Sequence, residues 1–204
     1  MGFKELFLHM GGMKKYIGAA VMVFATGIFL GSVFANEYKD FVMAQLSGLG
    51  KIKEEIEGRE YPQLLLFIII FLNNAIKSVL VVLSGVLLGV FPIAFLALNG
   101  LVLGYIGAVQ AEQGMLMQVI KVIVPHGVLE IPAIILASAY GMRFGALCLK
   151  ALVGALLAPA RGEAARKELK QFVRMLKPLS ILLVLVLLVA AIIESTFSYW
   201  LAGI

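Results

Sequence analysis

The chain has 204 residues, of which 62% are apolar and only 14% charged, and its mean hydropathy is +1.02. Soluble proteins carry about 25% charged residues, so this composition excludes a soluble enzyme and indicates a polytopic membrane protein. We attribute the net charge of +5 to membrane orientation and lipid headgroups, with no nucleic acid as partner.

Five apolar runs follow one another along the chain, each long enough to cross a bilayer core about 30 Å thick. The sequence therefore predicts an all-α fold, a polytopic membrane helical bundle that forms one integral-membrane domain over residues 1–204. About five transmembrane helices are expected, together with one re-entrant or interfacial helix. The predicted spans are 17–35, 64–91, 92–109, 126–150 and 179–200.

The first span follows a short amphipathic stretch that contains His9, which lies outside the membrane segment. No A-x-A-like cleavage site follows the apolar run, so we expect a retained helix rather than a signal peptide. Gly27 and Gly31 form a small-x-x-x-small pair that permits close helix approach. Residues 36–62, which are rich in Glu, predict an amphipathic helix that lies over the bundle.

The second and third spans carry polar side chains that lipid cannot satisfy. Asn73, Asn74 and Lys77 form a polar stripe on the second span, and Asn99 lies in the third. We expect the stripe to face other helices. Pro92 predicts a tight turn between these two spans.

Residues 114–124 form an apolar stretch that is too short to cross the bilayer, which predicts a re-entrant or interfacial helix that ends at Pro125. The fourth span then follows, and a basic loop at 160–178 precedes the fifth. Placing the basic amino terminus and this loop in the cytoplasm predicts a multi-pass protein of the cell membrane with its N-terminus cytoplasmic and its C-terminus outside.

His126 and Glu130 lie one helical turn apart in the motif HG-x-x-E, so they share one helix face. A charged residue such as Asp costs about 2.5–3.5 kcal/mol at the centre of a membrane helix, which implies a partner or a purpose. The full candidate polar intramembrane cluster is Asn73, Asn74, Lys77, Asn99, His126 and Glu130.

Three interpretations of this cluster stay open. It is a buried hydrogen-bonded network that fixes helix register, or a site for a divalent metal such as zinc, or an ion or proton pathway. His126 and Glu130 are the candidate metal ligands, because helical metal sites use this spacing and asparagine oxygens could complete the shell.

Several motifs follow one another in a fixed order: Asn73-Asn74, Gly85 and Gly89, Asn99-Gly100 with Gly104, the HG-x-x-E motif at 126–130, and the small-residue helix that continues to Gly141. In this order they resemble the motifs of the stage II sporulation protein M family. The resemblance covers residues 64–145 closely and the rest of the chain through its span count. Members of this family in endospore-forming bacteria are membrane scaffolds for cell-wall hydrolases, and many other bacteria and archaea carry relatives.

The resemblance implies an integral-membrane scaffold or assembly protein without catalysis of its own. The alternatives are a small ion or metal transporter that uses the Asn/His/Glu cluster, and an intramembrane metal-dependent hydrolase, although the chain contains no H-E-x-x-H motif. The expected partners are membrane lipid, other membrane or cell-envelope proteins, and a second copy of the chain in a homodimer.

Overall fold

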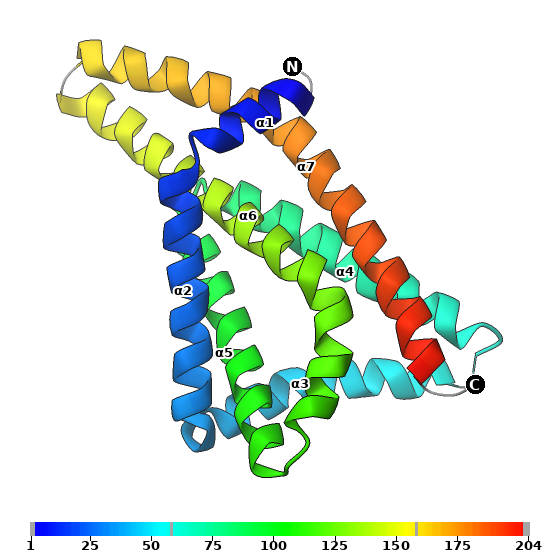
Figure 1. The fold of residues 1–204 in the computed structure, drawn as a ribbon. Helices are drawn as coiled ribbons and strands as arrows, with labels where there is room; N and C mark the ends of the chain where they lie inside the picture. The colour runs from blue at the N-terminus through cyan, green and yellow to red at the C-terminus, as the bar shows by residue number, and fades with distance from the viewer. Residues whose placement is uncertain (1–2, 58, 158, 202–204) are drawn as a thin grey trace.

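The computed structural model describes residues 3–57, 59–157 and 159–201, and these residues form helices and no strand. The all-α prediction is confirmed (Figure 1). In chain order the helices are α1 (Phe3–Gly11), α2 (Lys14–Val33), α3 (Ala35–Glu57), α4 (Pro62–Ser84), α5 (Val90–Glu112), α6 (Leu116–Leu157) and α7 (Pro159–Leu201).

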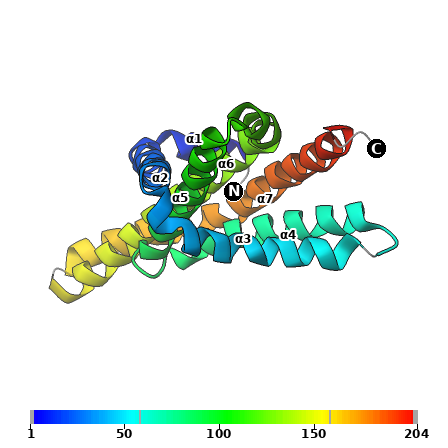
Figure 2. The same ribbon diagram turned by 90° about the horizontal axis from the view of Figure 1, so that it is seen from below.

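Five of these helices, α2, α4, α5, α6 and α7, are long and apolar enough to cross a membrane, which confirms the predicted number of spans. α2 packs along α5, and α6 packs along α7. α6 contacts both α2 and α5, so it joins the two pairs, and α4 packs against α6 and α7. α3 lies across the lower end of the bundle in Figure 1 and contacts α5 and α4; seen from below in Figure 2, α3 and α4 extend toward the same side of the molecule.

Glycines bring α2 and α5 into direct backbone contact. A Cβ atom built on Gly27 would overlap the Ala97 carbonyl, and one on Gly31 would overlap the Leu101 carbonyl. The reverse also holds, since Gly100 and Gly104 of α5 face the backbone of α2 in the same way. The predicted small-x-x-x-small pair is thus confirmed, and it meets a second such pair on the opposite helix.

A second glycine contact joins the turn between α4 and α5 to α6. Gly89 has φ +75, a left-handed conformation that favours glycine, and it ends the turn immediately before α5. Cβ atoms at Gly85 and Gly145 would overlap backbone atoms of Gly141 and Gly89, respectively. The turn therefore lies at residues 85–89 and not at Pro92, which belongs to the first turns of α5, where a proline is well tolerated.

The prediction of a separate helix at 114–124 is wrong, because the residues from Leu116 onward form the first turns of α6. Pro125 does not end a helix; it and Pro132 lie inside this continuous helix of 42 residues, which is visibly bent in Figure 1. Membrane helices tolerate interior prolines because neighbouring helices and local adjustments satisfy the freed backbone groups.

The basic segment at 160–178, expected as a loop, is also helical and continues without interruption into the fifth span. The resulting α7 has 43 residues and contains Pro178. At about 1.5 Å per residue, a helix of this length spans about twice the bilayer core. Parts of α6 and α7 must therefore lie outside the hydrocarbon region or cross it obliquely.

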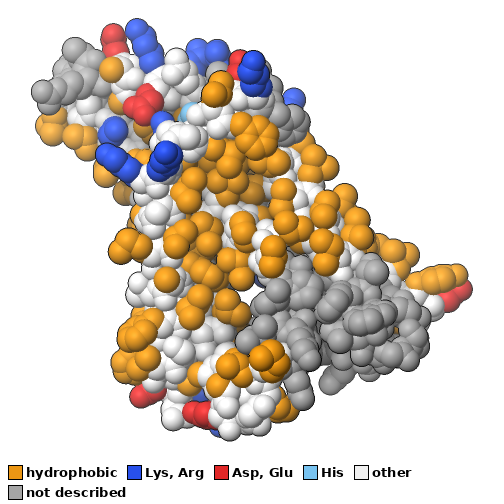
Figure 3. Space-filling view, in the orientation of Figure 1, with side chains coloured by type: hydrophobic (Ala, Val, Ile, Leu, Met, Phe, Trp, Pro, Cys, Tyr) orange, Lys and Arg blue, Asp and Glu red, His pale blue; other side chains and the backbone are white. Residues whose placement is uncertain are grey.

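Apolar and charged side chains separate along the long axis of the molecule. Figure 3 shows an apolar band around the middle, blue and red side chains gathered at the end that holds α1, and a few acidic side chains at the end that holds α3. The main buried core combines residues of α1, α2, α4, α5, α6 and α7, and a smaller one of Val42, Leu101 and Tyr105 joins α3 to α5.

Candidate functional site

The described members of the predicted polar cluster differ in their exposure. On α4 the Asn73 and Lys77 side chains are exposed, whereas Asn74 is half-buried. The Asn73 Nδ2 donates to Asn74 Oδ1 over 3.5 Å, a contact between neighbours in sequence. The expectation that the whole stripe is buried between helices is therefore wrong at Asn73 and Lys77.

The remaining members lie on α5 and α6. Asn99 is half-buried, and its Nδ2 donates to the Phe95 carbonyl of its own helix at 2.8 Å. Glu130 is half-buried and has an interaction partner. His126 belongs to α6, but its side chain lies outside the described residues. Among the side chains that are described, no three His, Cys, Asp or Glu residues gather as a metal site requires.

Two serines lie buried at the packing of α4 against α6. Ser78 and Ser138 each have 0% exposure, and neither hydroxyl has a hydrogen-bond partner among the described atoms. Ser78 lies one turn before the α4 residues that contact Gly141, and Ser138 lies three residues before that glycine. Asn74 lies one turn before Ser78 on the same face of α4. This is the most buried polar strip in the described part of the bundle.

A different cluster, which we call the α1 junction, holds the first helix against α6 and α7. It consists of His9, Tyr140, Arg143, Glu168 and Phe172. The His9 Nδ1 and the Tyr140 hydroxyl are 3.1 Å apart, and the rings of both residues pack against the Phe172 ring. Tyr140 is completely buried and Phe172 nearly so. Residues 131 positions apart in the sequence thus form one aromatic contact.

Arg143 supplies the charge of the α1 junction. Its guanidinium donates to the Met13 Sδ at 3.1 Å, lies 3.5 Å from a Glu168 carboxylate oxygen, and sits over the Phe172 ring at 5.6 Å. The Arg143 side chain is only 18% exposed. Burial, and secondly this neighbouring cation, hold the pKa of His9 below its ordinary value of 6.5, which favours the neutral ring.

The α1 junction could not be found from His9 alone, which the sequence places outside the spans. The available signal was Arg143, a cation inside a long apolar run, because such residues in membrane segments have partners or functions. Its partners come from α1 and α7, and only the folded chain brings those helices together.

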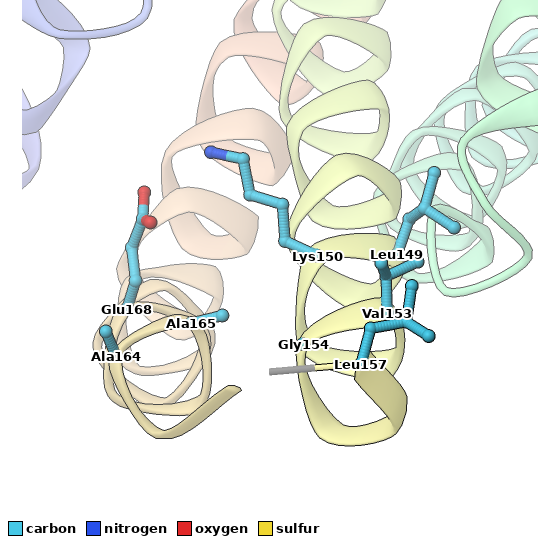
Figure 4. A pocket seen from close by; sticks show the side chains of 8 residues that line it. All are labelled: Leu149, Lys150, Val153, Gly154, Leu157, Ala164, Ala165 and Glu168. Atoms are coloured by element: carbon cyan, nitrogen blue, oxygen red, sulfur yellow. The ribbon is translucent and has the colours of Figure 1, made fainter. Parts of the chain in front are cut away.

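An open groove of about 590 Å³ lies between α6 and α7, farther from the bundle than Arg143. Figure 4 shows the charged side chains of Lys150 and Glu168 extending along the helices in the same direction, away from the end of the hairpin. Most of the other lining residues are apolar or small: Leu149, Val153, Gly154, Leu157, Ala164 and Ala165.

Comparison with known proteins agrees with the sequence resemblance. The family described as "Stage II sporulation protein M" matches residues 20–199. A curated relative, an uncharacterized protein from Methanocaldococcus jannaschii, is 29% identical over 118 residues, which are 58% of this chain and 50% of that protein. The chain thus matches about half the length of this relative. No solved structure matches the chain. Because the family match takes in most of the chain, this multi-pass membrane protein belongs to the stage II sporulation protein M family.

Proposed function

We propose that the protein is an integral-membrane scaffold without catalysis of its own, which positions partner membrane or cell-envelope proteins. A second copy of the chain is among the expected partners. The observation that carries this proposal is the backbone packing at the two glycine contacts, α2 against α5 and the 85–89 turn against α6. With no side chain between the backbones, these helices form a fixed frame.

α3 offers this frame a surface for partners. The helix lies outside the span bundle, where its residue Val42 is buried against α5. On the two flanks of Val42, α3 exposes Phe41 (42%) beside the charged Glu37 and Met43 (52%) beside the charged Asp40. Exposed apolar side chains bordered by charges are typical of protein interaction surfaces.

The test is site-specific photo-crosslinking in the native membrane. A photoreactive residue at Met43 should give a discrete protein adduct, whereas the matched probe at Met22, an exposed position within the α2 span, should label lipid. An adduct of twice the chain's mass would identify a second copy as the partner. Absence of any protein adduct at Met43, together with ion flux through purified protein in liposomes, would reject the scaffold.

A small ion or metal transporter is the second candidate, and the buried serines favour it. Hydroxyls of Ser78 and Ser138 without described partners could contribute to a polar path near Asn74. If this candidate holds, Ser78→Ala and Asn74→Ala should each reduce ion flux in proteoliposomes. Flux that is equal in the variants and the wild type would leave the serines as packing residues.

A further inference from the structure

The last part of α6, residues 144–157, and the first part of α7, residues 159–174, pack as a helical hairpin, which we call the arm. Two landmarks show where it leaves the bundle. Lys14 and Lys15 begin the first span, and Arg143 contacts Met13 beside them, so Arg143 lies at the level where the basic end of the bundle meets the headgroups. At about 1.5 Å per residue, α6 continues for about 21 Å beyond Arg143 to Leu157.

The arm is a packed unit. A Cβ atom built on Gly162 would lie 2.8 Å from the Gly154 backbone carbon, so the two helices touch through their backbones. Leu147 and Phe172 are buried at its base. Figure 1 shows the arm leaning sideways from the axis of α2 rather than continuing along it.

One side of the arm presents a stripe of large apolar side chains at helical spacing on α6. These residues are 44–80% exposed, which is an unusual density of apolar surface for a segment in water. The stripe consists of Leu149, Leu152, Val153, Leu156 and Leu157.

The rest of the arm is strongly basic. Residues 144–174 contain six Lys and Arg residues and two Glu residues. One of the two, Glu168, already contacts Arg143 at the base. Lys150 stands at the rim of the groove and has no ion-pair partner among the described residues. Two such arms would repel each other, so the charge argues against a second copy as the occupant of this surface.

We propose that the arm lies in the anionic surface of the membrane. The leucine stripe sits among the acyl chains, the Lys150 ammonium contacts a lipid phosphate, and the groove beside it takes an acyl chain of an anionic phospholipid. Amphipathic helices that combine a basic side with a leucine side bind membranes in this way, through buried apolar area and attraction to anionic lipids. An acidic protein would pair with the cations but would leave the leucine stripe without an apolar environment.

The first test follows the depth of the arm. In a Cys148→Ala background, an environment-sensitive fluorophore is attached to Leu156→Cys or, as the matched control, to the exposed Lys167→Cys. The protein is placed in nanodiscs of phosphatidylcholine, with or without phosphatidylglycerol. At Leu156 we expect a blue shift and loss of emission with brominated acyl chains, both larger with phosphatidylglycerol. The Lys167 probe should respond to an aqueous quencher only.

Three results would overturn the proposal. A Leu156 probe that only the aqueous quencher reaches would place the stripe in water. Equal quenching by brominated lipid with and without phosphatidylglycerol would show that the anionic lipid does not contribute to the binding of the arm. A disulfide between two Leu156→Cys copies would show that a second chain covers the stripe.

The second test addresses the groove. Native mass spectrometry of the purified protein with added phosphatidylglycerol should show lipid retention about fivefold weaker in Lys150→Gln, the effect expected for one surface cation. Lys167→Gln removes the same charge outside the groove lining and should retain lipid like the wild type. Equal losses in the two variants would reject a specific site beside Lys150.

Discussion

At the scale of single residues, the α1 junction shows how a short terminal helix is held to a membrane bundle. The His9 ring contacts the rings of Tyr140 and Phe172, and its Nδ1 shares a hydrogen bond with the hydroxyl of the buried Tyr140. Arg143 is the cation that acts on the His9 ring, and Glu168 is the carboxylate that partly balances it. A second positive charge on His9 would be unfavourable here, so the docking of α1 depends on a neutral imidazole.

The pH dependence of α1 docking follows from the lowered pKa of His9. Because the undocked His9 binds a proton more readily, docking is fully stable above pH 6.5 and weakens as the pH falls through the lower pKa of the docked state. We expect the hydrogen-exchange protection of α1 to be lower at about pH 5 than at about pH 7.5, while the α2 and α5 spans stay protected at both pH values.

The control for this prediction is His9→Gln, which keeps a neutral hydrogen-bonding side chain but cannot gain a proton near neutral pH. Its α1 protection should change little over the same pH range. If the variant lost protection in acid as the wild type does, the pH dependence of α1 docking would not come from His9.

The same scale shows what could be predicted of the candidate site. Asn74, Asn99 and Glu130 are half-buried, and their gathering into one intramembrane cluster stays a prediction. The exposure of Asn73 and Lys77 depends on the rotation of α4 against α6, which the sequence pattern does not fix. The metal site at His126 and Glu130 stays a prediction.

At the scale of elements, glycines determine where the helices cross. Gly31 and Gly104 occupy positions where any added methyl group would meet the backbone of the partner helix. Gly18 and Gly107 lie on the same two helices, yet a Cβ atom there would meet nothing within 4 Å. The chain therefore offers its own matched controls for testing whether close approach stabilises the fold.

We expect Gly31→Ala and Gly104→Ala each to lower the free energy of unfolding by about 1–3 kcal/mol, the usual cost of overpacking. Gly18→Ala and Gly107→Ala should be neutral or stabilising by about 0.5–1 kcal/mol, because alanine favours helix and has room there. Thermal unfolding of the purified protein in one detergent measures all four. Equal destabilisation in both pairs would mean that the α2–α5 contact is not specific to these glycines.

The helices also show why some elements could be predicted and others could not. Five spans follow directly from apolar length, and the Gly27/Gly31 pair correctly indicated a close crossing. The continuity of α6 through Pro125 could not be read from the sequence, because the same proline ends a helix in water and only bends one whose backbone is protected by neighbours. In the same way, the basic residues at 160–178 resembled a loop by composition alone, but they are helical and pack along α6.

At the scale of the whole molecule, the two ends differ in charge. The end that holds α1 and the arm carries exposed cations that include Lys14, Lys15 and Arg174, whereas Glu37 and Glu112 lie at the end that holds α3. Lys and Arg near span ends are retained on the cytoplasmic side, while Asp and Glu contribute little to orientation. The separation therefore favours the arm in the cytoplasm and α3 outside.

Cysteine accessibility in intact cells tests this orientation. In the Cys148→Ala background, Glu55→Cys on α3 and Lys167→Cys on the arm are both exposed, so neither should disturb packing. A membrane-impermeant maleimide should label position 55 in intact cells and position 167 only after permeabilisation, because the bilayer blocks the reagent. The opposite pattern would show that the protein has the reverse orientation. α3 would then lie in the cytoplasm and could not contact partners on the cell-envelope side.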